Sequence, residues 1–289
     1  MNCKYKTIKV NKNWIQKNII QKGWQRFVYP SSVNKFAGDI RNGEFDSSQI
    51  TVAIDKEGKY ILIDGQHRLE AIKKEDIEIE MEFRVYEDLE EEQMYKIYYR
   101  ENTGRVFRLV DDLKGYIELK KYEWLNAFVE GGGNFPIEVT IRGGINSIKV
   151  GDIINVLYNG LRESIVRANL TRTKLPLFLE DLDSEKFGLM KDFCFLYKKC
   201  FGNPHRDNWM YKNAIMFTFL RIWIKNQKNF KDEEFVKRWR PVERNSSVRQ
   251  EATAGVFDTM ILESMTKKIY KIINKGCSKN LMEEFWKEN

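Results

Sequence analysis

The pattern that decides the fold lies in residues 50–72, in the stretch ITVAIDKEGKYILIDGQHRLEAI. An alternating, β-branched segment, QITVAID, is followed by KEG and then by the apolar run KYILI, which together predict a β-hairpin. Asp64-Gly65 ends the second strand, and an apolar pattern of helical period begins at once, so residues 66–74 are expected to form a helix. One of the two histidines in the chain, His67, lies at this strand-to-helix junction.

Strands and helices continue to alternate on both sides of this stretch. Residues 31–42 are predicted to form a short helix, IEMEFRVYE a third strand, and LEEEQMYKIYYRENTGR a helix that ends near Gly104. From about residue 116 the pattern changes to long segments with a wide apolar stripe of helical period. We therefore expect an α+β protein, with an α/β domain at residues 1–115 and a mainly helical domain at residues 116–289.

The composition favours a folded cytoplasmic protein. With 42% hydrophobic residues, including 18 Phe, 13 Tyr and 7 Trp, the 289 residues can bury a substantial core. The sequence shows no run of about 18 apolar residues and no secretory leader, so no membrane partner is expected. The four cysteines are scattered without a framework, which fits a reducing compartment.

The net charge of +7 is unevenly distributed along the chain. Residues 1–38 hold eight Lys/Arg and no acid, and residues 75–92 hold ten acids against a single Arg. A third segment at residues 237–249, KRWRPVERNSSVR, holds five basic residues against one Glu. Such runs are often solvated faces, but two basic segments in a basic chain also suit a polyanion, of which nucleic acid is the commonest.

The third segment is a candidate nucleic-acid contact. It combines arginines with Trp239, which is expected to be exposed because few core residues surround it. Arg238, Arg240 and Arg244 would then lie on a loop and contact the phosphates of DNA, the expected partner. A solvated loop without a ligand is the alternative.

The Asp-Gly-Gln-His-Arg junction has the chemistry of an anion site. A strand that turns directly into a helix exposes the first N–H groups of the helix, and the helix dipole adds partial positive charge there. His67 and Arg68 add donors in the first turn, and Gly65 lets a ligand approach the backbone. Asp64 would repel a bare phosphate, so we expect it to orient a neighbour, hold a sugar hydroxyl, or serve a metal or a proton transfer. On spacing alone, an ordinary turn with a solvated helix start is the alternative.

The string IDGQHRLEAI resembles the signature of DGQHR-domain proteins, within the wider ParB/sulfiredoxin-like superfamily, and in particular the DndB-type proteins of DNA phosphorothioation systems. In sulfiredoxin a Gly-Cys-His-Arg motif at the corresponding turn holds ATP phosphates through His and Arg, and ParB proteins use Gly-Glu-Arg-Arg for CTP phosphates. The resemblance covers residues 20–115 and implies that Gly65, Gln66, His67 and Arg68 bind a nucleotide. Because Gln66 stands where sulfiredoxin has its nucleophilic cysteine, sulfinic acid reduction is excluded.

Two further motifs are implied by the same resemblance. The string ENTGR, from Glu101, has the spacing of the ParB motif Glu-Asn-x-x-Arg, in which Glu and Asn meet a nucleotide-bound Mg²⁺, although a Gly replaces the usual Gln. Glu101 and Asn102 are therefore candidate metal ligands, and Arg105 is a candidate phosphate contact. A helix end capped by that Gly is the alternative. Gln25 and Arg26 precede a capped helix, as the first box of many such domains does, and are weaker candidates for cofactor binding.

These expectations together describe a nucleoside-triphosphate-binding protein in a DNA-related process such as modification, defence or its regulation. It would be a Mg²⁺-dependent NTPase or phosphotransferase, with ATP preferred over CTP or GTP. Asp64, His67 and Arg68 would form the catalytic group, in which Asp64 aligns a water or hydroxyl and the other two hold phosphates. The helical domain would supply a lid, a homodimer surface or a DNA-binding face.

Two alternatives remain open from the sequence. In the first, the protein is a metal-dependent DNA nuclease of the ParB-like type, in which Asp64 and Glu101 hold the ion. In the second, it is a non-enzymatic regulator that binds DNA or a partner protein and has a degenerate nucleotide pocket.

Overall fold

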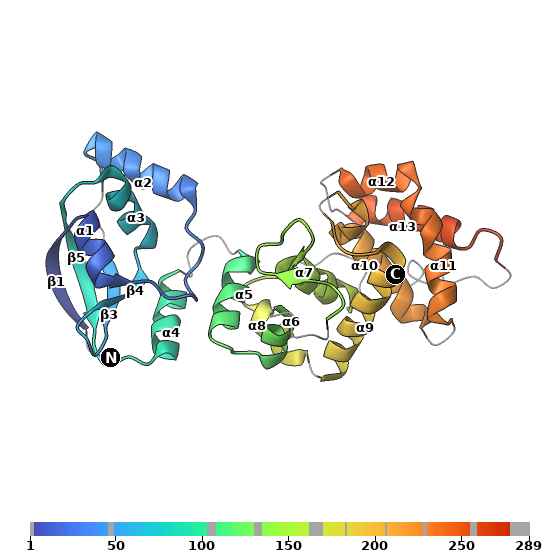
Figure 1. The fold of residues 1–289 in the computed structure, drawn as a ribbon, viewed down its shortest axis with the longest axis horizontal. Coiled ribbons are helices and arrows are strands. Elements are labelled where there is room, and N and C mark those ends of the chain that lie inside the picture. The colour runs from blue at the N-terminus through green and yellow to red at the C-terminus, as the bar shows by residue number, and fades with distance from the viewer. Residues whose placement is uncertain are drawn as a thin grey trace. The chain divides into compact units, whose positions relative to one another are not determined.

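The computed structural model describes residues 3–45, 49–102, 108–129, 135–161, 170–182, 184–205, 207–227, 230–254 and 259–277. The chain divides into two compact units, Met1–Lys121 and Tyr122–Asn289 (Figure 1). The last helix of the first unit is α5 (Leu109–Glu118), which the boundary expected at residue 115 would cut.

A five-stranded mixed sheet forms the centre of the N-terminal unit (Figure 1). Its strands are β1 (Cys3–Val10), β2 (Ile19–Ile20), β3 (Ile50–Ile54), β4 (Tyr60–Asp64) and β5 (Ile79–Tyr86), in the order β1-β5-β3-β4-β2. β3 and β4 pair antiparallel, which confirms the predicted hairpin, and β5 lies parallel to β3 on its other side. β1 runs antiparallel to β5 along its whole length, and β2 pairs parallel with β4.

Helices cover both faces of this sheet. The helices of this unit, besides α5, are α1 (Lys12–Asn18), α2 (Pro30–Asn42), α3 (Gln66–Glu75) and α4 (Glu91–Glu101). Leu62 and Phe83 from the strands and Leu69 from α3 are fully buried in one core. Because side chains alternate along a strand, the buried Ile63 points to the opposite face, and α4 lies against β4. The strand before the turn at residues 64–66 and the helix after it both pack in the core, so the turn is held from both sides.

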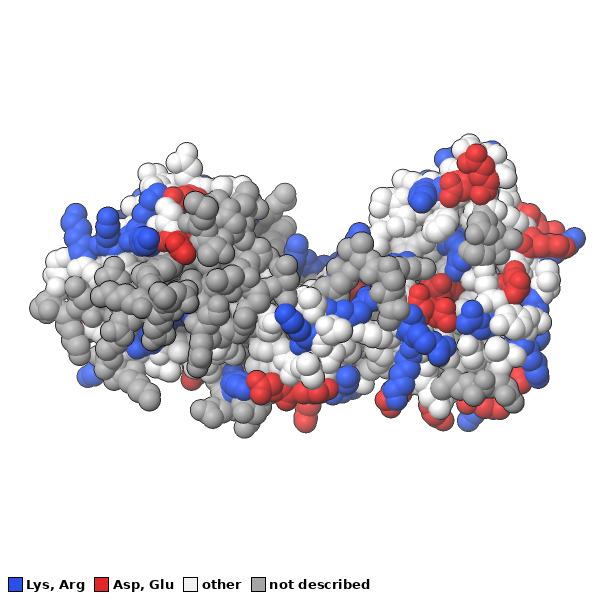
Figure 2. Space-filling model, turned by 180° about the vertical axis from the view of Figure 1, so that it is seen from behind, with Lys and Arg blue, Asp and Glu red and all other residues white. Residues whose placement is uncertain are grey.

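The N-terminal strand β1 places the basic start of the chain against acidic residues that are remote in sequence. Lys4 Nζ lies 2.9 Å from a carboxylate oxygen of Glu87, and Lys9 Nζ lies 3.9 Å from one of Glu80. The basic run at residues 1–38 and the acidic run at 75–92 thus offset each other in part. Figure 2, seen from behind relative to Figure 1, shows basic and acidic side chains interspersed over the described surface. The N-terminal run by itself is therefore a poor candidate for a polyanion surface.

The C-terminal unit is mainly helical, which confirms the α+β class with a helical second part. Its described elements are α6 (Glu123–Val129), β6 (Val139–Thr140), β7 (Ile148–Lys149), α7 (Val150–Gly160), α8 (Lys174–Asp181), α9 (Ser184–Phe201), the 3₁₀ helix η1 (Trp209–Tyr211), α10 (Asn213–Asn226), α11 (Asp232–Glu243), α12 (Ser246–Thr253) and α13 (Thr259–Ile273). α10 is buried along most of its length, and α7 packs closely on it because Gly160 leaves room for Leu220. In the described part of the chain, no helix has the length and apolarity needed to cross a membrane.

The basic segment at residues 237–249 is helical and not the expected loop. It includes the end of α11 and the start of α12, and Trp239 is completely buried. The expectation of an exposed Trp239 is wrong because Phe235, Trp239 and Val242 recur at helical spacing and bury one face of α11, despite the charged residues between them.

Candidate functional site

The strand-to-helix turn between β4 and α3 is built around Gly65. Its φ of +109° is a backbone conformation that residues with a Cβ rarely adopt. A Cβ here would lie 2.4 Å from Cδ1 of Ile50, so the turn also packs directly on the core. The Gly65 carbonyl accepts hydrogen bonds from the N–H groups of Arg68 and Leu69, both at 3.0 Å, and these bonds start α3.

A cavity of about 390 Å³ opens at the N-terminus of α3. Its walls come from the loop before α2, from α2 and from the turn: Arg26, Ser32, Lys35, Phe36, Asp64, Gly65, Gln66, His67 and Arg68. Three of these side chains are Lys or Arg and one is an acid, while the dipole of α3 adds partial positive charge at this end. The cavity therefore has the electrostatics of an anion site.

Asp64 and Arg68, both predicted site residues, form an ion pair. Arg68 Nη2 lies 3.0 Å from Asp64 Oδ2, and the two side chains are only 10% and 16% exposed. Asp64 thus orients the guanidinium, which is one of the roles expected from the sequence. A phosphate entering the cavity would compete with Asp64 for the Arg68 donors.

His67 is almost fully buried and connects the turn to the loop before α2. Its Nε2 accepts the backbone N–H of Tyr29 at 3.0 Å, and its Nδ1 lies 3.1 Å from Nη2 of Arg26. Both ring nitrogens therefore contact groups of the protein itself, and a neutral imidazole can accept a hydrogen bond at only one of them. With Nε2 accepting from Tyr29, Nδ1 carries the proton and cannot accept from Arg26, so this geometry favours a positioning role in which His67 ties the turn to the loop through the Tyr29 N–H.

The loop that carries Arg26 is anchored from two other helices. The hydroxyl of Tyr98 on α4 accepts the backbone N–H of Arg26 at 3.2 Å, and burial raises the pKa of Tyr98 to about 12. The Tyr29 hydroxyl donates to Asp111 of α5 at 2.9 Å, and the Arg108 guanidinium lies 3.9 Å from the centre of the Tyr29 ring. Arg26 is thereby held in place by its flanking backbone.

The two glutamines predicted at the site differ in their surroundings. Gln25 is 2% exposed and donates from Nε2 to the Leu62 carbonyl at 3.0 Å, so it braces the loop against β4 beneath the cavity. Gln66 lines the cavity, and its Oε1, like that of Gln25, is buried with no hydrogen-bond partner among the residues that the structure describes. A buried acceptor of this kind favours a ligand that brings a donor.

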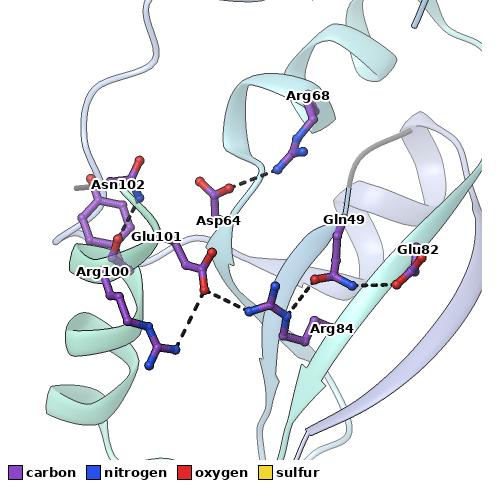
Figure 3. Close-up of polar contacts among 9 residues, drawn as sticks. Gln49, Asp64, Arg68, Glu82, Arg84, Arg100, Glu101 and Asn102 are labelled. Atoms are coloured by element: carbon purple, nitrogen blue, oxygen red, sulfur yellow. Dashed lines mark hydrogen bonds and ion pairs between the residues drawn. The ribbon is translucent and has the colours of Figure 1, made fainter. Parts of the chain in front are cut away.

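Glu101 and Asn102, the predicted metal ligands, lie at the end of α4. Arg84 Nη1 contacts Glu101 Oε1 at 2.9 Å, and Arg84 Nε donates to Gln49 at 2.7 Å (Figure 3). Asn102 donates from Nδ2 to the Tyr98 carbonyl at 2.8 Å. In the described residues no group of three or more His, Cys, Asp or Glu side chains could hold a metal by itself. Arg105 lies outside the described residues.

The sheet brings the two predicted motifs to one place. Thr51 on β3 pairs with Asp64 on β4 and with Arg84 on β5, so Asp64 and Arg84 flank it in one row across three strands. Two strand spacings separate the outer members by about 10 Å. The Asp64–Arg68 and Glu101–Arg84 ion pairs therefore lie at the same end of the sheet (Figure 3).

The three predicted nucleic-acid contacts do not form one exposed group. Arg238 is 9% exposed, pairs with Glu234 and lies over the ring of Phe230. Only Arg240 and Arg244 are exposed. Arg238 thus stabilises its own unit and is unsuited to contact DNA.

Sequence reasoning missed three residues of the cavity, Ser32, Lys35 and Phe36 on α2. Lys35 and Phe36 follow Ser32 by three and four positions on a predicted helix, so the three share one face. That face meets the turn because Ala37 of α2 packs against Ala71 of α3. Among the described residues Lys35 forms no ion pair, so its charge is available to a ligand.

No family model matches this chain, and no curated protein does. Two solved structures are similar to it at low identity. The C-terminally truncated chromosome-partitioning protein ParB from Caulobacter crescentus, complexed with CTP-γ-S, is 11% identical, with a TM-score of 0.29 over 91% of this chain and 98% of that chain. A Pnob8-like ParB-N domain is 14% identical, with a TM-score of 0.33 over 93% and 99%. Both TM-scores are too low to assign a family, so function is inferred from the residues of this chain.

Proposed function

We propose that the N-terminal unit binds a nucleoside triphosphate through the cavity at the N-terminus of α3. The observation that carries this proposal is the cationic lining of that cavity, in which Arg26, Lys35 and Arg68 surround a helix N-terminus against the single carboxylate of Asp64. A chain of phosphates spreads several negative charges over a length that three separate cations can follow. A single carboxylate or a neutral ligand would leave most of this charge unmatched.

Five of the lining residues would contact the nucleotide in this proposal. Arg26, Lys35 and Arg68 hold the phosphates, and the turn at Gly65 presents the first N–H groups of α3 to them. The buried Oε1 of Gln66 accepts a hydroxyl or amino group of the nucleotide.

Mg²⁺ would enter with the nucleotide. The Glu101 carboxylate and the Asn102 amide oxygen are ligands that suit this ion, with phosphate oxygens and water completing its shell. Because Glu101 contacts Arg84, the ion would have to share this carboxylate with the guanidinium. ATP is the preferred nucleotide, and CTP and GTP are the other candidates. The resemblance to DGQHR-domain proteins supports a role in a DNA-related process, as an NTPase or phosphotransferase.

The ion pairs favour this proposal over the nuclease alternative. Asp64 and Glu101, the carboxylates that would hold a catalytic ion, each contact an arginine, Arg68 and Arg84. A nuclease ion would have to compete with both arginines for these carboxylates, whereas Mg²⁺ that enters with a triphosphate brings phosphate oxygens as ligands, and the arginines attract the same phosphates.

A thermal-shift panel tests nucleotide binding. We expect one of ATP, GTP, CTP or UTP with Mg²⁺ to raise the melting temperature of the wild-type protein by several degrees, since a ligand at about 100 times its dissociation constant adds roughly 2.7 kcal/mol. The shift should be lost in Arg68→Ala. It should be retained in Arg41→Ala, a control arginine whose ion pair with Glu75 links α2 to α3 and lies outside the cavity.

Two results would contradict the proposal: no shift with any nucleotide, or an equal shift in wild type and Arg68→Ala. If the protein then nicked supercoiled plasmid in the presence of Mg²⁺ or Mn²⁺ and without nucleotide, that result would favour the nuclease.

Asp64→Asn separates binding from catalysis. Removing the carboxylate frees Arg68 donors and deletes one negative charge from the cavity, so we expect nucleotide affinity to rise about fivefold, from roughly 1 kcal/mol of relieved repulsion. If Asp64 aligns the attacking water or hydroxyl, phosphate release should fall at least about 100-fold in the same variant. Calorimetry and a phosphate-release assay measure the two effects, with Asp39→Asn on α2 as control. Weaker binding in Asp64→Asn would instead make Asp64 a positioning residue for Arg68.

A further inference from the structure

A second and larger cavity lies within the C-terminal unit. It has a volume of about 750 Å³ and is open to solvent. Three parts of the chain that are far apart in sequence contribute residues to its lining: residues 142–152, around the turn between β6 and β7 and the start of α7; residues 204–205 and 208–214, around η1; and Ala252 of α12. None of the residues predicted from the sequence to be functional lies in this cleft.

The charged residues of this cleft are predominantly basic. Arg142, Lys149 and Lys212 line it and are exposed. The single acid, Asp152, accepts a hydrogen bond from Nδ2 of Asn213 at 3.0 Å. In the part of the chain that the structure describes, neither Lys149 nor Lys212 forms an ion pair. Two of the three cations are thus uncompensated by neighbouring carboxylates.

The turn at Gly143-Gly144 fixes the shape of one wall. Gly143 has a φ of +75°, and a Cβ there would lie 2.7 Å from Cγ of Lys149. The aliphatic stem of Lys149 therefore lies across the turn at a position that glycine alone leaves open. Ile145, the next residue, is 65% exposed. This wall thus combines a held lysine with an apolar side chain exposed to solvent.

The polar groups of the cleft suit the phosphodiester backbone of nucleic acid better than they suit a small-molecule ligand. A small-ligand site usually encloses its ligand and aims several directed donors and acceptors at it. Here the amides are engaged within the protein: Asn213 binds Asp152, and Asn208 accepts the Met210 N–H and donates to the Phe201 carbonyl. Exposed cations in an open cleft are what the phosphodiester backbone of nucleic acid requires.

We infer that this cleft binds the sugar–phosphate backbone of nucleic acid, through Arg142, Lys149 and Lys212. This gives the C-terminal unit a ligand of its own and does not depend on the nucleotide cavity of the N-terminal unit. It also moves the expected nucleic-acid contact away from the segment that contains the buried Arg238 and Trp239.

The test compares two triple variants of the full-length chain by fluorescence anisotropy with a labelled duplex of about 20 base pairs, at salt concentrations from about 50 to 200 mM. The cleft variant carries Arg142→Ala, Lys149→Ala and Lys212→Ala. The matched control carries Lys237→Ala, Arg240→Ala and Arg244→Ala, three exposed cations of the same unit. Thermal melting verifies that both variants fold.

The cleft variant should bind duplex about 100-fold more weakly than wild type at the lower salt, and the slope of log affinity against log salt should fall by about 2 to 3. The control should lose less than about threefold. Nucleotide-induced thermal shifts should remain in the cleft variant, so failure of this inference is distinguishable from failure of the proposed nucleotide site.

Three outcomes would overturn the inference. One is wild-type affinity in the cleft variant. Another is an equal or larger loss in the control, which would indicate a general charge effect or a nucleic-acid contact at residues 237–249. The third is pyrophosphate binding that needs the three cleft cations while wild type binds no duplex, which would make the cleft a small-anion site.

Discussion

Trp239→Ala is expected to lower the free energy of unfolding of the C-terminal unit by about 3–5 kcal/mol, the usual cost of removing a fully buried large aromatic side chain. Trp239 is 0% exposed, and the centre of its ring lies 4.7 Å from that of Phe219 and 6.1 Å from that of Phe235. Hydrogen–deuterium exchange of peptides from α9, α10 and α11 measures this loss where it occurs.

Trp239→Phe and Arg240→Ala are the matched controls for this prediction. The indole Nε1 of Trp239 has no hydrogen-bond partner among the described residues, so phenylalanine should cost far less than alanine. Arg240, the next residue, is exposed, and its removal should change stability by less than about 0.5 kcal/mol. Unchanged protection in Trp239→Ala, together with weakened DNA binding, would restore the exposed contact that the sequence suggested.

Gly65→Ala is expected to destabilise the N-terminal unit by about 2–4 kcal/mol. Two terms add: the strain of a Cβ at a φ of +109°, and the overlap of that Cβ with Cδ1 of Ile50, which is fully buried and has little room to move. Chemical denaturation followed by exchange of peptides from β3, β4 and α3 would report the change.

Gly58→Ala isolates the first of these terms. Gly58 has a φ of +79°, but a Cβ there would meet no atom within 4 Å. We expect this variant to lose about 1 kcal/mol, the cost of the left-handed conformation alone. Equal losses in the two variants would show that contact with Ile50 is not what requires glycine at position 65.

Local pattern was enough to predict the elements around the turn. The hairpin of β3 and β4 and the helix that follows Gly65 appear where alternation, the Asp-Gly break and the 3.6-residue period place them. These signals are short-range, because strand and helix periods are properties of the backbone itself. The two terminal strands of the sheet, β1 and β2, have no comparably clean pattern and were not predicted.

Residues 237–249 were predicted to form a loop, but they are helical, because their pattern mixes charged residues with a helical apolar face. The segment contains several arginines and few core residues around Trp239, which suggested a loop. Pro241 lies in the last turn of α11, and the Asn245 side chain accepts the Val248 N–H at 3.0 Å to start α12. Burial of a single helical face outweighed the polar character of the other.

By itself, the sequence determined that a glycine turn joins a strand to a helix and that His67 and Arg68 stand in the first turn, since these follow from residues adjacent in the chain. Only the tertiary structure decided which groups meet: Lys35 of α2 at the cavity, Asp64 with Arg68, and Lys4 with Glu87 across 83 positions. The physical reason is that electrostatic and steric contacts depend on distance in space, and in a folded chain strand register and helix packing set that distance.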